Sequence, residues 1–216
     1  GAADSFSRLA VARQQSSSLN PDQALAMKVV PSMTSPRAFP EAGQPERLGP
    51  PATLDAAQQA AADELLNGPR RGVYGPFRPL LHRPPLLRAV AKVGETLRYE
   101  GTLDAALREW TICVVARELS NAFEWDMHLP LAAAAGVPAA ALAALDAGEP
   151  SPSDLRADLV LARTVASELL SRHRLSEETW NEGRRVWGES MLVEVLTLVG
   201  YFAMVCWLMN VARTPG

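Results

Sequence analysis

The chain has 216 residues, of which 48% are hydrophobic and 21% are charged, and its formal net charge is −3 at neutral pH. This length and apolar content predict one globular domain with an additional segment. The 21 basic residues are scattered, with only short clusters such as 70–71 and 184–185, so no basic stripe indicates a nucleic-acid partner.

The two cysteines, Cys113 and Cys206, lie within apolar runs that are typical of helix interiors. Free cysteine is among the most often buried residue types, so both are predicted to be core side chains. Their positions indicate no disulfide framework, metal site or Cys-x-x-Cys redox pair. The first residues, GAADSF, include neither Met nor a signal pattern. We leave the location open between the cytoplasm and, if a leader was removed, the periplasm.

Residues 1–52 differ from the rest because they are rich in Ser, Pro, Gln and Ala, with prolines at 21, 31, 36, 40, 45, 50 and 51. Proline blocks helix propagation and cannot donate to a sheet ladder. One short helix is expected over 21–29, where Asn20 can cap it and Pro21 can occupy its first position. The remainder is predicted to be an irregular arm that packs on the body or on a neighbouring subunit.

Residues 53–216 are predicted to form one all-α domain, because the spacing of apolar residues is helical almost throughout and no strand-like alternation occurs. An irregular loop rich in Pro and Gly is expected over 68–85. The expected helices cover 54–66, 85–99, 103–120, 123–135, 138–147, 151–173, a segment capped by Ser176 and interrupted by Gly188, and 191–212.

The last expected helix, 191–212, is apolar enough and long enough to cross a bilayer, which takes about 20 residues. The alternative is a core helix, since the other helices are amphipathic and need a central partner to cover their apolar faces. We predict the core helix, and therefore no membrane span.

The stretch 109–128, EWTICVVARELSNAFEWDMH, carries the residues most suggestive of chemistry. Glu124 and His128 are four residues apart and share a helix face, while Glu109 lies on the preceding helix. Two carboxylates and an imidazole that meet between helices can transfer protons. A carboxylate would raise the imidazole pKa and burial would lower it. The alternative is an exposed Glu–His pair that contributes a few tenths of a kcal/mol.

A family resemblance is carried by residues 107–148, LREWTICVVARELSNAFEWDMHLPLAAAAGVPAAALAALDAG. The stretch has an Arg-Glu pair opening an apolar helix, a turn, an acidic-aromatic-x-x-His segment, and a run of small residues ending in Gly-Val. This pattern resembles the carboxymuconolactone decarboxylase family, which shares its fold with alkylhydroperoxidase D. Segments on either side extend the resemblance over 55–212, which implies an alkylhydroperoxidase D-like helical bundle behind an irregular Pro-rich N-terminal arm.

The peroxidase branch of that fold has a Glu, then a Cys-x-x-Cys pair, and a His four residues after the second Cys. In this sequence the Glu and the His correspond to Glu109 and His128, whereas the cysteine positions hold Asn121 and Glu124. Neither Asn nor Glu can form a peroxide-reactive thiolate. The resemblance therefore implies the decarboxylase branch, a lyase or isomerase of small unsaturated carboxylated compounds.

The implied mechanism uses His128 as the general acid–base, with Glu109 or Glu124 setting its tautomer and pKa, and it needs no metal or organic cofactor. The candidate catalytic residues are thus His128, Glu109 and Glu124. A cation is expected to hold a substrate carboxylate, and the loop before the helix at 85–99 offers Arg78, His82 and Arg83, unless these are surface charges. The candidate substrate-binding residues are Arg78, Tyr74, Phe77 and Asn121.

Two other functions stay open. One is a peroxiredoxin-like, alkylhydroperoxidase-type activity, which the absent Cys-x-x-Cys pair opposes. The other is a non-catalytic oligomeric binder of small molecules, because a fold does not determine a function. A non-catalytic oligomeric scaffold on the same fold is the related alternative, and a cleft filled by Trp110 or Trp125 would favour it. Under each reading we expect a homo-oligomer, most simply a dimer or trimer and possibly higher, since residues 132–147 are rich in Ala and the last helix is apolar.

Overall fold

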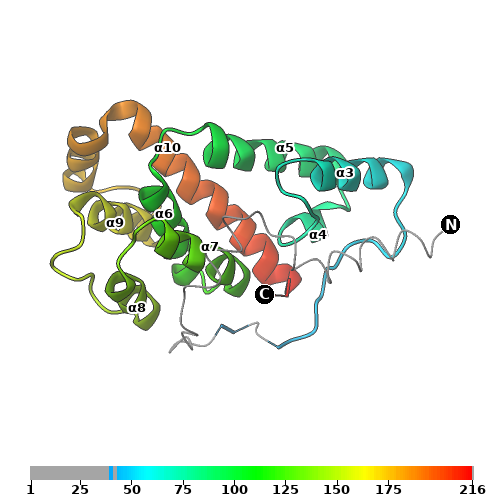
Figure 1. The fold of residues 1–216 in the computed structure, drawn as a ribbon, viewed down its shortest axis with the longest axis horizontal. Coiled ribbons are helices and arrows are strands. Elements are labelled where there is room, and N and C mark those ends of the chain that lie inside the picture. The colour runs from blue at the N-terminus through cyan, green and yellow to red at the C-terminus, as the bar shows by residue number, and fades with distance from the viewer. Residues whose placement is uncertain (1–38, 41–42, 216) are drawn as a thin grey trace.

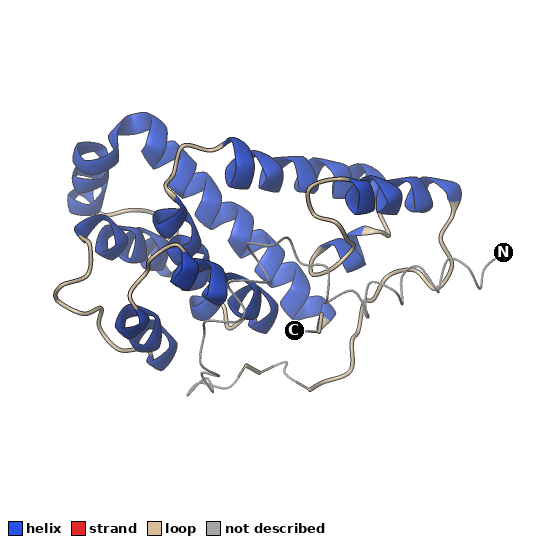
Figure 2. Cartoon of the chain, in the orientation of Figure 1, coloured by secondary structure: helices blue, strands red, loops and turns tan. Residues whose placement is uncertain are grey.

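The computed structural model describes residues 39–40 and 43–215, and within these every regular element is a helix, as Figure 2 shows. The prediction of an all-α fold is confirmed. The helix expected over 21–29 and most of the N-terminal arm lie outside the described residues. Their boundary with the helical domain stays a prediction.

A long C-terminal helix, α10, crosses the middle of the molecule, with α3 and α5 on one side of it and α6 to α9 on the other (Figure 1). The elements are α3 (Ala56–Asn67), α4 (Phe77–Leu80), α5 (Pro84–Glu95), η1 (Thr96–Glu100), α6 (Ala105–Glu118), α7 (Ala122–Ala134), α8 (Ala139–Ala147), α9 (Ala157–Arg172) and α10 (Glu177–Ala212). Helix α6 packs against α7, α9 and α10, so it lies at the centre of the core.

Local capping explains where α3 begins. The Asp55 side chain accepts a hydrogen bond from the backbone N–H of Gln58, and the Gln58 side chain accepts one from the N–H of Asp55. This reciprocal pair satisfies two of the backbone donors that a helix start leaves free. The first turn of α3 is therefore determined within four residues.

The segment 68–85 is less irregular than expected, because it contains the one-turn helix α4. Pro79 is compatible with this helix, since the first turn has no intrahelical use for its missing N–H. The helix expected over 85–99 is α5 followed directly by η1, a turn of π-helix. Single π-turns are rare and are frequent at functional sites, and the sequence pattern did not predict this one.

Helix α9 begins at Ala157, six residues later than expected. The intervening segment forms a turn in which the N–H of Leu155 donates to the carbonyl of Pro152, and the Leu155 side chain is buried. Arg156 then bonds to Asp104, the N-cap of α6, and to Asp158. Residues 151–155, which were expected to open the helix, therefore form a turn, and the helix follows it.

Helix α10 is interrupted at Gly188, whose φ of 69° and ψ of 176° are not helical, as the sequence predicted. Beyond the interruption, its inner face supplies the core with Val195, Leu198, Phe202, Cys206 and Met209. Among the described residues, α10 is the one helix that passes a length-and-hydropathy test for a membrane span, and half of its most apolar window is buried inside the protein.

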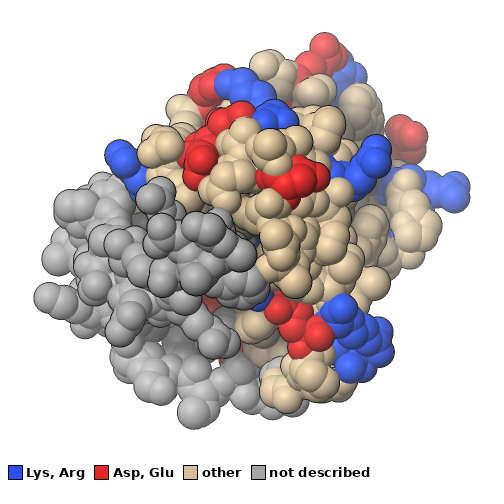
Figure 3. All heavy atoms as spheres, turned by 90° about the vertical axis from the view of Figure 1, so that its right-hand side faces the viewer, with Lys and Arg blue, Asp and Glu red and all other residues tan. Residues whose placement is uncertain are grey.

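The described part of the N-terminal segment lies against the helical body. The N–H groups of Arg47 and Leu48 donate to the carbonyl of Ala212 at the end of α10. Glu46 forms a two-pronged ion pair with Arg78, at 2.7 and 3.0 Å. On the face drawn in Figure 3, the described basic and acidic side chains are interspersed rather than segregated by sign.

Candidate functional site

The site is built by two consecutive helices. Helix α6 carries Glu109, while α7 carries Glu124 and His128 one turn apart. Asn121 joins the two helices: its side chain caps α7 by accepting from the N–H of Glu124, and it donates to the Asn210 side chain of α10 at 2.7 Å. The cap sets where α7 begins, and hence the direction in which Glu124 and His128 point.

The three side chains form a continuous chain of contacts. His128 Nδ1 lies 2.6 Å from Glu109 Oε2, and His128 Nε2 lies 3.2 Å from Glu124 Oε2. All three are buried, with 2 to 4% of each residue exposed. The Glu–His pair is thus not the exposed surface pair that the sequence left as an alternative. Burial makes each unmet hydrogen bond costly, so the arrangement is held firmly.

Both ring nitrogens of His128 face a carboxylate, and both can donate only when the ring is an imidazolium. Burial opposes the charged ring, but the charges and hydrogen bonds of Glu109 and Glu124 raise the pKa of His128 above its ordinary value. Burial likewise opposes the Glu109 carboxylate, yet His128, with the charges of Arg98 and Arg108, lowers the Glu109 pKa. The raised pKa of His128 and the lowered pKa of Glu109 both favour the charged forms, so the two side chains form an ionised pair.

Two neighbours fix the ring and its partner. Arg108 Nε donates to the second oxygen of Glu109 at 3.2 Å, so that carboxylate is held from both sides. The Phe202 ring meets the His128 ring edge to face, with centroids 5.3 Å apart. Hydrogen bonds to the back of an imidazole set its orientation in many proton-transfer sites. Glu109 is in the position to do this here.

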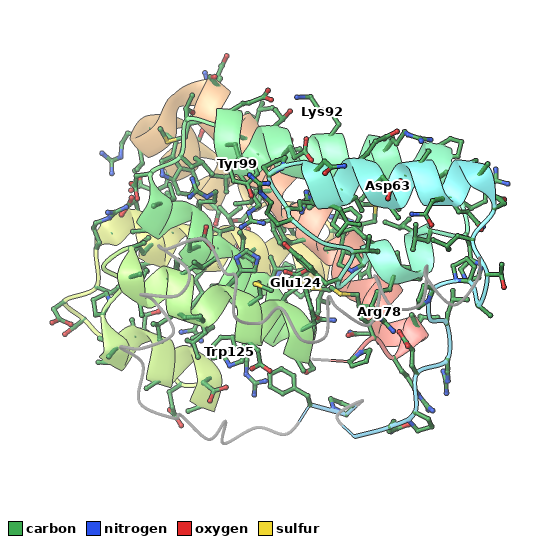
Figure 4. The ribbon with its side chains drawn as sticks, turned by 45° about the vertical axis from the view of Figure 1, so that its right-hand side comes forward. Asp63, Arg78, Lys92, Tyr99, Glu124 and Trp125 are labelled. Atoms are coloured by element: carbon green, nitrogen blue, oxygen red, sulfur yellow. The ribbon has the colours of Figure 1, made fainter. Side chains whose placement is uncertain are left out.

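A small cavity of about 30 Å³ opens beside His128 and Glu124. Its walls come from the 68–77 segment, η1, α7 and α10, and its lining residues are Arg70, Tyr74, Pro76, Phe77, Arg98, Phe123, Glu124, Met127, His128, Tyr201, Phe202 and Val205. Glu109 is not among them, so it lies behind the imidazole. In Figure 4, Glu124 points into the interior between these elements, whereas Trp125 lies on the other side of α7.

The candidate substrate-binding residues separate into two groups. Tyr74 and Phe77 line the cavity. Arg78, which is labelled in Figure 4, does not line it, because its guanidinium is paired with Glu46. Asn121 is also outside the lining and serves as the α7 cap. Neither His82, whose Nε2 lies 3.0 Å from the carbonyl oxygen of Gly49, nor Arg83 lines the cavity.

The cavity residues that were not anticipated from the sequence include Arg70, Arg98, Tyr201 and Phe202. Arg70 was visible as half of a short basic cluster, and that pattern resembles any surface pair. Tyr201 and Phe202 lie more than 70 residues from His128, inside an apolar helix, where no local spacing separates a site residue from a core residue. Only the tertiary contact of α10 with α7, where the Phe202 ring meets the His128 ring, reveals them.

The cysteines lie in the core, as predicted. Cys113 and Cys206 have no measurable exposure, and burial raises the pKa of both thiols well above the ordinary value. A raised pKa disfavours the thiolate that peroxide chemistry requires. In the part of the chain that the structure describes, no group of three or more His, Cys, Asp and Glu side chains could hold a metal ion.

Comparison with protein-family models gives a match in the middle of the chain. Residues 84–150 match the model of the carboxymuconolactone decarboxylase family, and this segment contains Glu109, Glu124 and His128. The match confirms the resemblance inferred from the sequence, and the all-α alkylhydroperoxidase D-like fold of the family agrees with the helices observed. Neither the curated proteins nor the solved structures include a significant match.

Proposed function

From the premise that residues 84–150 are a carboxymuconolactone decarboxylase family segment, we propose that the protein is a cofactor-independent lyase or isomerase. Its substrates would be small unsaturated carboxylated compounds, and its chemistry would be proton transfer. The observation that carries the proposal is the buried chain Glu109–His128–Glu124, which ends at a cavity.

The contacts suggest a different role for each member. Glu109 is a positioning residue, because it binds Nδ1 from behind and does not reach the cavity. His128 is the acid–base, since its ring lines the cavity. Glu124 faces both Nε2 and the cavity, so it can exchange a proton between the imidazole and substrate or water. The division resembles other sites in which a carboxylate orients an imidazole.

In the decarboxylation, the bond between the carboxyl carbon and the ring breaks and CO₂ departs. The electron pair of that bond moves into the unsaturated system and gives a dienolate. The His128 imidazolium, directly or through Glu124, then donates its proton to the dienolate carbon. The neutral imidazole is reprotonated from solvent, so one proton is consumed for each CO₂ released. An isomerase would use the same groups to remove a proton from one carbon and return it to another.

The proposal is tested with carboxymuconolactone in D₂O, with CO₂ release and deuterium incorporation measured. We expect the wild type to release CO₂ and to place deuterium on the protonated carbon. His128→Ala should lower kcat by at least about a hundredfold, which is the usual contribution of a general acid–base. His128→Gln serves as a second variant that retains polar volume between the two carboxylates.

His173→Asn is the matched control, because His173 is an exposed histidine at the C-cap of α9 with a φ of 62°, which Asn tolerates. It should keep wild-type turnover. Circular dichroism of every variant reports whether the helices persist. Wild-type turnover in folded His128→Ala would contradict the proton-transfer assignment.

The alternatives are less well supported. A thiol peroxidase would need a reactive thiolate, and positions 121 and 124 hold Asn and Glu while Cys113 and Cys206 are buried. A non-catalytic scaffold would be favoured by a cleft filled with tryptophan. Trp110 instead bonds to the carbonyl of Leu159 within the core, and Trp125 packs near Arg117. Neither lines the cavity.

We propose that the protein is a homo-oligomer. Three apolar residues on the outer face of α10 are well exposed, namely Met204, Trp207 and Val211, at 41, 55 and 68%. Their spacings of three and four residues place them on one stripe of the helix. A second copy of the chain is the simplest partner for such a stripe.

A further inference from the structure

We infer that Arg70 and Arg98 form a subsite for a carboxylate that the substrate keeps throughout the reaction. The two guanidiniums line the same cavity as His128 and Glu124, although they come from segments 28 residues apart in the sequence. This inference rests on the proposed function, because it specifies how the substrate of that site is held. It also replaces the loop arginine, Arg78, as the expected carboxylate partner.

Arg70 is a buried cation with unused hydrogen-bonding capacity. Only 5% of its side chain is exposed, and its guanidinium lies 4.4 Å from the centre of the Phe77 ring. Nη2 donates to the carbonyl of Ala91 at 3.2 Å. Nε forms an ion pair with Glu95 Oε1 at 3.7 Å, but it has no hydrogen-bond partner in the described structure. A buried donor without a partner is costly unless a ligand supplies one.

A glycine makes the space that Arg70 occupies. A methyl group at Gly94 on α5 would lie 2.6 Å from Arg70 Nη2 and closer still to the Tyr201 hydroxyl. No side chain larger than hydrogen therefore fits at this helix position while both groups stay in place. Glycine in a helix interior costs about 1 kcal/mol relative to Ala. Its presence here leaves room for a guanidinium and a hydroxyl to sit side by side.

Arg98 approaches the cavity from the π-turn η1, which follows α5. A π-turn rotates the following side chains relative to a regular helix. Arg98 is partly exposed, and in the described chain no carboxylate lies within 4 Å of its guanidinium. Its guanidinium carbon lies 5.4 Å from the centre of the Tyr99 ring. It is thus free to accept an anion.

The charges of Arg70 and Arg98 both affect the two tyrosines of the cavity, Tyr74 and Tyr201. Burial raises the pKa of Tyr74 and Tyr201, and the charges of both Arg70 and Arg98 oppose that shift. Both guanidiniums therefore lie within electrostatic reach of both hydroxyls, which also line the cavity. Tyr74 donates its own hydrogen bond to the carbonyl of Arg70 and so fixes the loop that carries it.

The chemistry of the ligand follows from these groups. A guanidinium presents a planar fork of donors that matches a carboxylate, and two of them beside aromatic walls suit a flat, unsaturated acid. The carboxylate held there must be one that is retained. A departing carboxylate becomes neutral CO₂, so a cation that gripped it would stabilise the ground state more than the transition state.

The cavity itself has room for a carboxylate group but not for a whole substrate. About 30 Å³ accommodates roughly two water molecules. The lining also includes the partly exposed side chains Tyr74, Phe123 and Met127. A larger acid would enter carboxylate first and displace these side chains outward. The smallest useful probe is therefore a short unsaturated acid.

The test measures binding of crotonate and of its neutral analogue crotonamide to the full chain by isothermal titration calorimetry. We expect crotonamide to bind at least about tenfold more weakly than crotonate, since hydrogen bonds to a charged group are the stronger ones. Arg70→Met and Arg98→Met should each raise the crotonate Kd by at least about tenfold. Arg88→Met is the matched control, because Arg88 is on α5 but pairs with Glu64 outside the cavity. It should leave the Kd unchanged.

Arg98→Met decides the matter if the buried Arg70→Met fails to fold, because Arg98 is partly exposed. Equal Kd values for crotonate and crotonamide, or a crotonate Kd within about twofold of wild type in folded Arg98→Met, would overturn the subsite. Full competition by equimolar inorganic phosphate would overturn its assignment to carboxylates. The two proposals fail separately. Arginine-dependent crotonate binding without CO₂ release contradicts only the proposed function, and CO₂ release with arginine-independent binding contradicts only the subsite.

Discussion

The imidazole of His128 has a carboxylate on each side, and the two contacts differ in length. The Nδ1 contact with Glu109 is 2.6 Å and the Nε2 contact with Glu124 is 3.2 Å. The shorter one is also supported by Arg108 at the far oxygen of Glu109. The longer one is on the cavity side. A firm contact behind the ring and a weaker one in front suit a group that must hold its orientation while it exchanges a proton.

The ionised pair of His128 and Glu109 should stabilise the folded protein only within a limited pH range. His128 has a raised pKa, so its contribution is complete below its ordinary value of 6.5 and is lost as pH rises through the raised value. Glu109 has a lowered pKa, so its contribution is complete above 4.5 and is lost as pH falls through the lowered value. The pair therefore stabilises most between pH 4.5 and 6.5.

Urea unfolding of the wild type and of His128→Gln measures this window. The difference in unfolding free energy between the two should shrink from about pH 5.5 to about pH 9, by about 1.4 kcal/mol for each unit by which the His128 pKa is raised. His173→Asn provides the comparison for general titration effects. A difference that stays constant across this range would show that His128 is not ionised in the folded protein.

At the scale of the elements, α6 and α8 are joined by an ion pair that is removed from water. Arg117 Nε lies 2.9 Å from Asp146 Oδ1, and each side chain is 1% exposed. The Arg117 guanidinium also stacks on the Phe39 ring at 4.4 Å, which ties the described N-terminal segment to the body. Helix α6 positions Glu109, so the placement of the site depends partly on this contact.

Asp146→Ala should destabilise the fold by about 3–5 kcal/mol, because it leaves the Arg117 charge buried without its carboxylate. Chemical unfolding followed by circular dichroism measures the loss. Glu149→Ala, an exposed carboxylate three residues away, is the control and should change stability by less than about 0.5 kcal/mol. Equal effects of the two variants would mean that the buried pair contributes little.

Helix ends could be predicted from the sequence where they depend on neighbouring residues. The Asp55 capping box, the Asn121 cap and the interruption at Gly188 depend on residues within a few positions, and the corresponding helix ends were close to those expected. The late start of α9 depends on a distant partner. Arg156 reaches Asp104, which is 52 residues away, and no local pattern contains that information.

At the scale of the whole molecule, α10 has two apolar faces. Its inner face is buried against α6 and α9, while the stripe Met204–Trp207–Val211 is exposed. Exposed apolar patches of this kind mark contacts with a partner more often than free surface. Helix α10 also supplies Tyr201 and Phe202 to the cavity, so a partner bound to this stripe would contact the helix that forms part of the site.

We expect the wild type to be oligomeric and the double variant Trp207→Glu/Val211→Glu to shift to monomer, because two charges would be placed on the contact stripe. Size-exclusion chromatography with light scattering gives the mass directly. Val93→Glu is the control, since Val93 is also exposed, at 44%, but lies on α5. A monomeric wild type, or a double variant with the wild-type mass, would exclude this stripe as the interface.

The sequence by itself determined the helical class, most helix ends, the interruption of the last helix and the pairing of a carboxylate with His128 four residues later. These features depend on neighbours within one or two turns. The tertiary structure alone decided that Glu109 meets Nδ1 and Glu124 meets Nε2, that the pair is buried, and that Arg70 and Arg98 line the cavity while Arg78 does not. Those facts depend on how segments far apart in the chain pack together, because burial and orientation are set by contacts that sequence spacing does not encode.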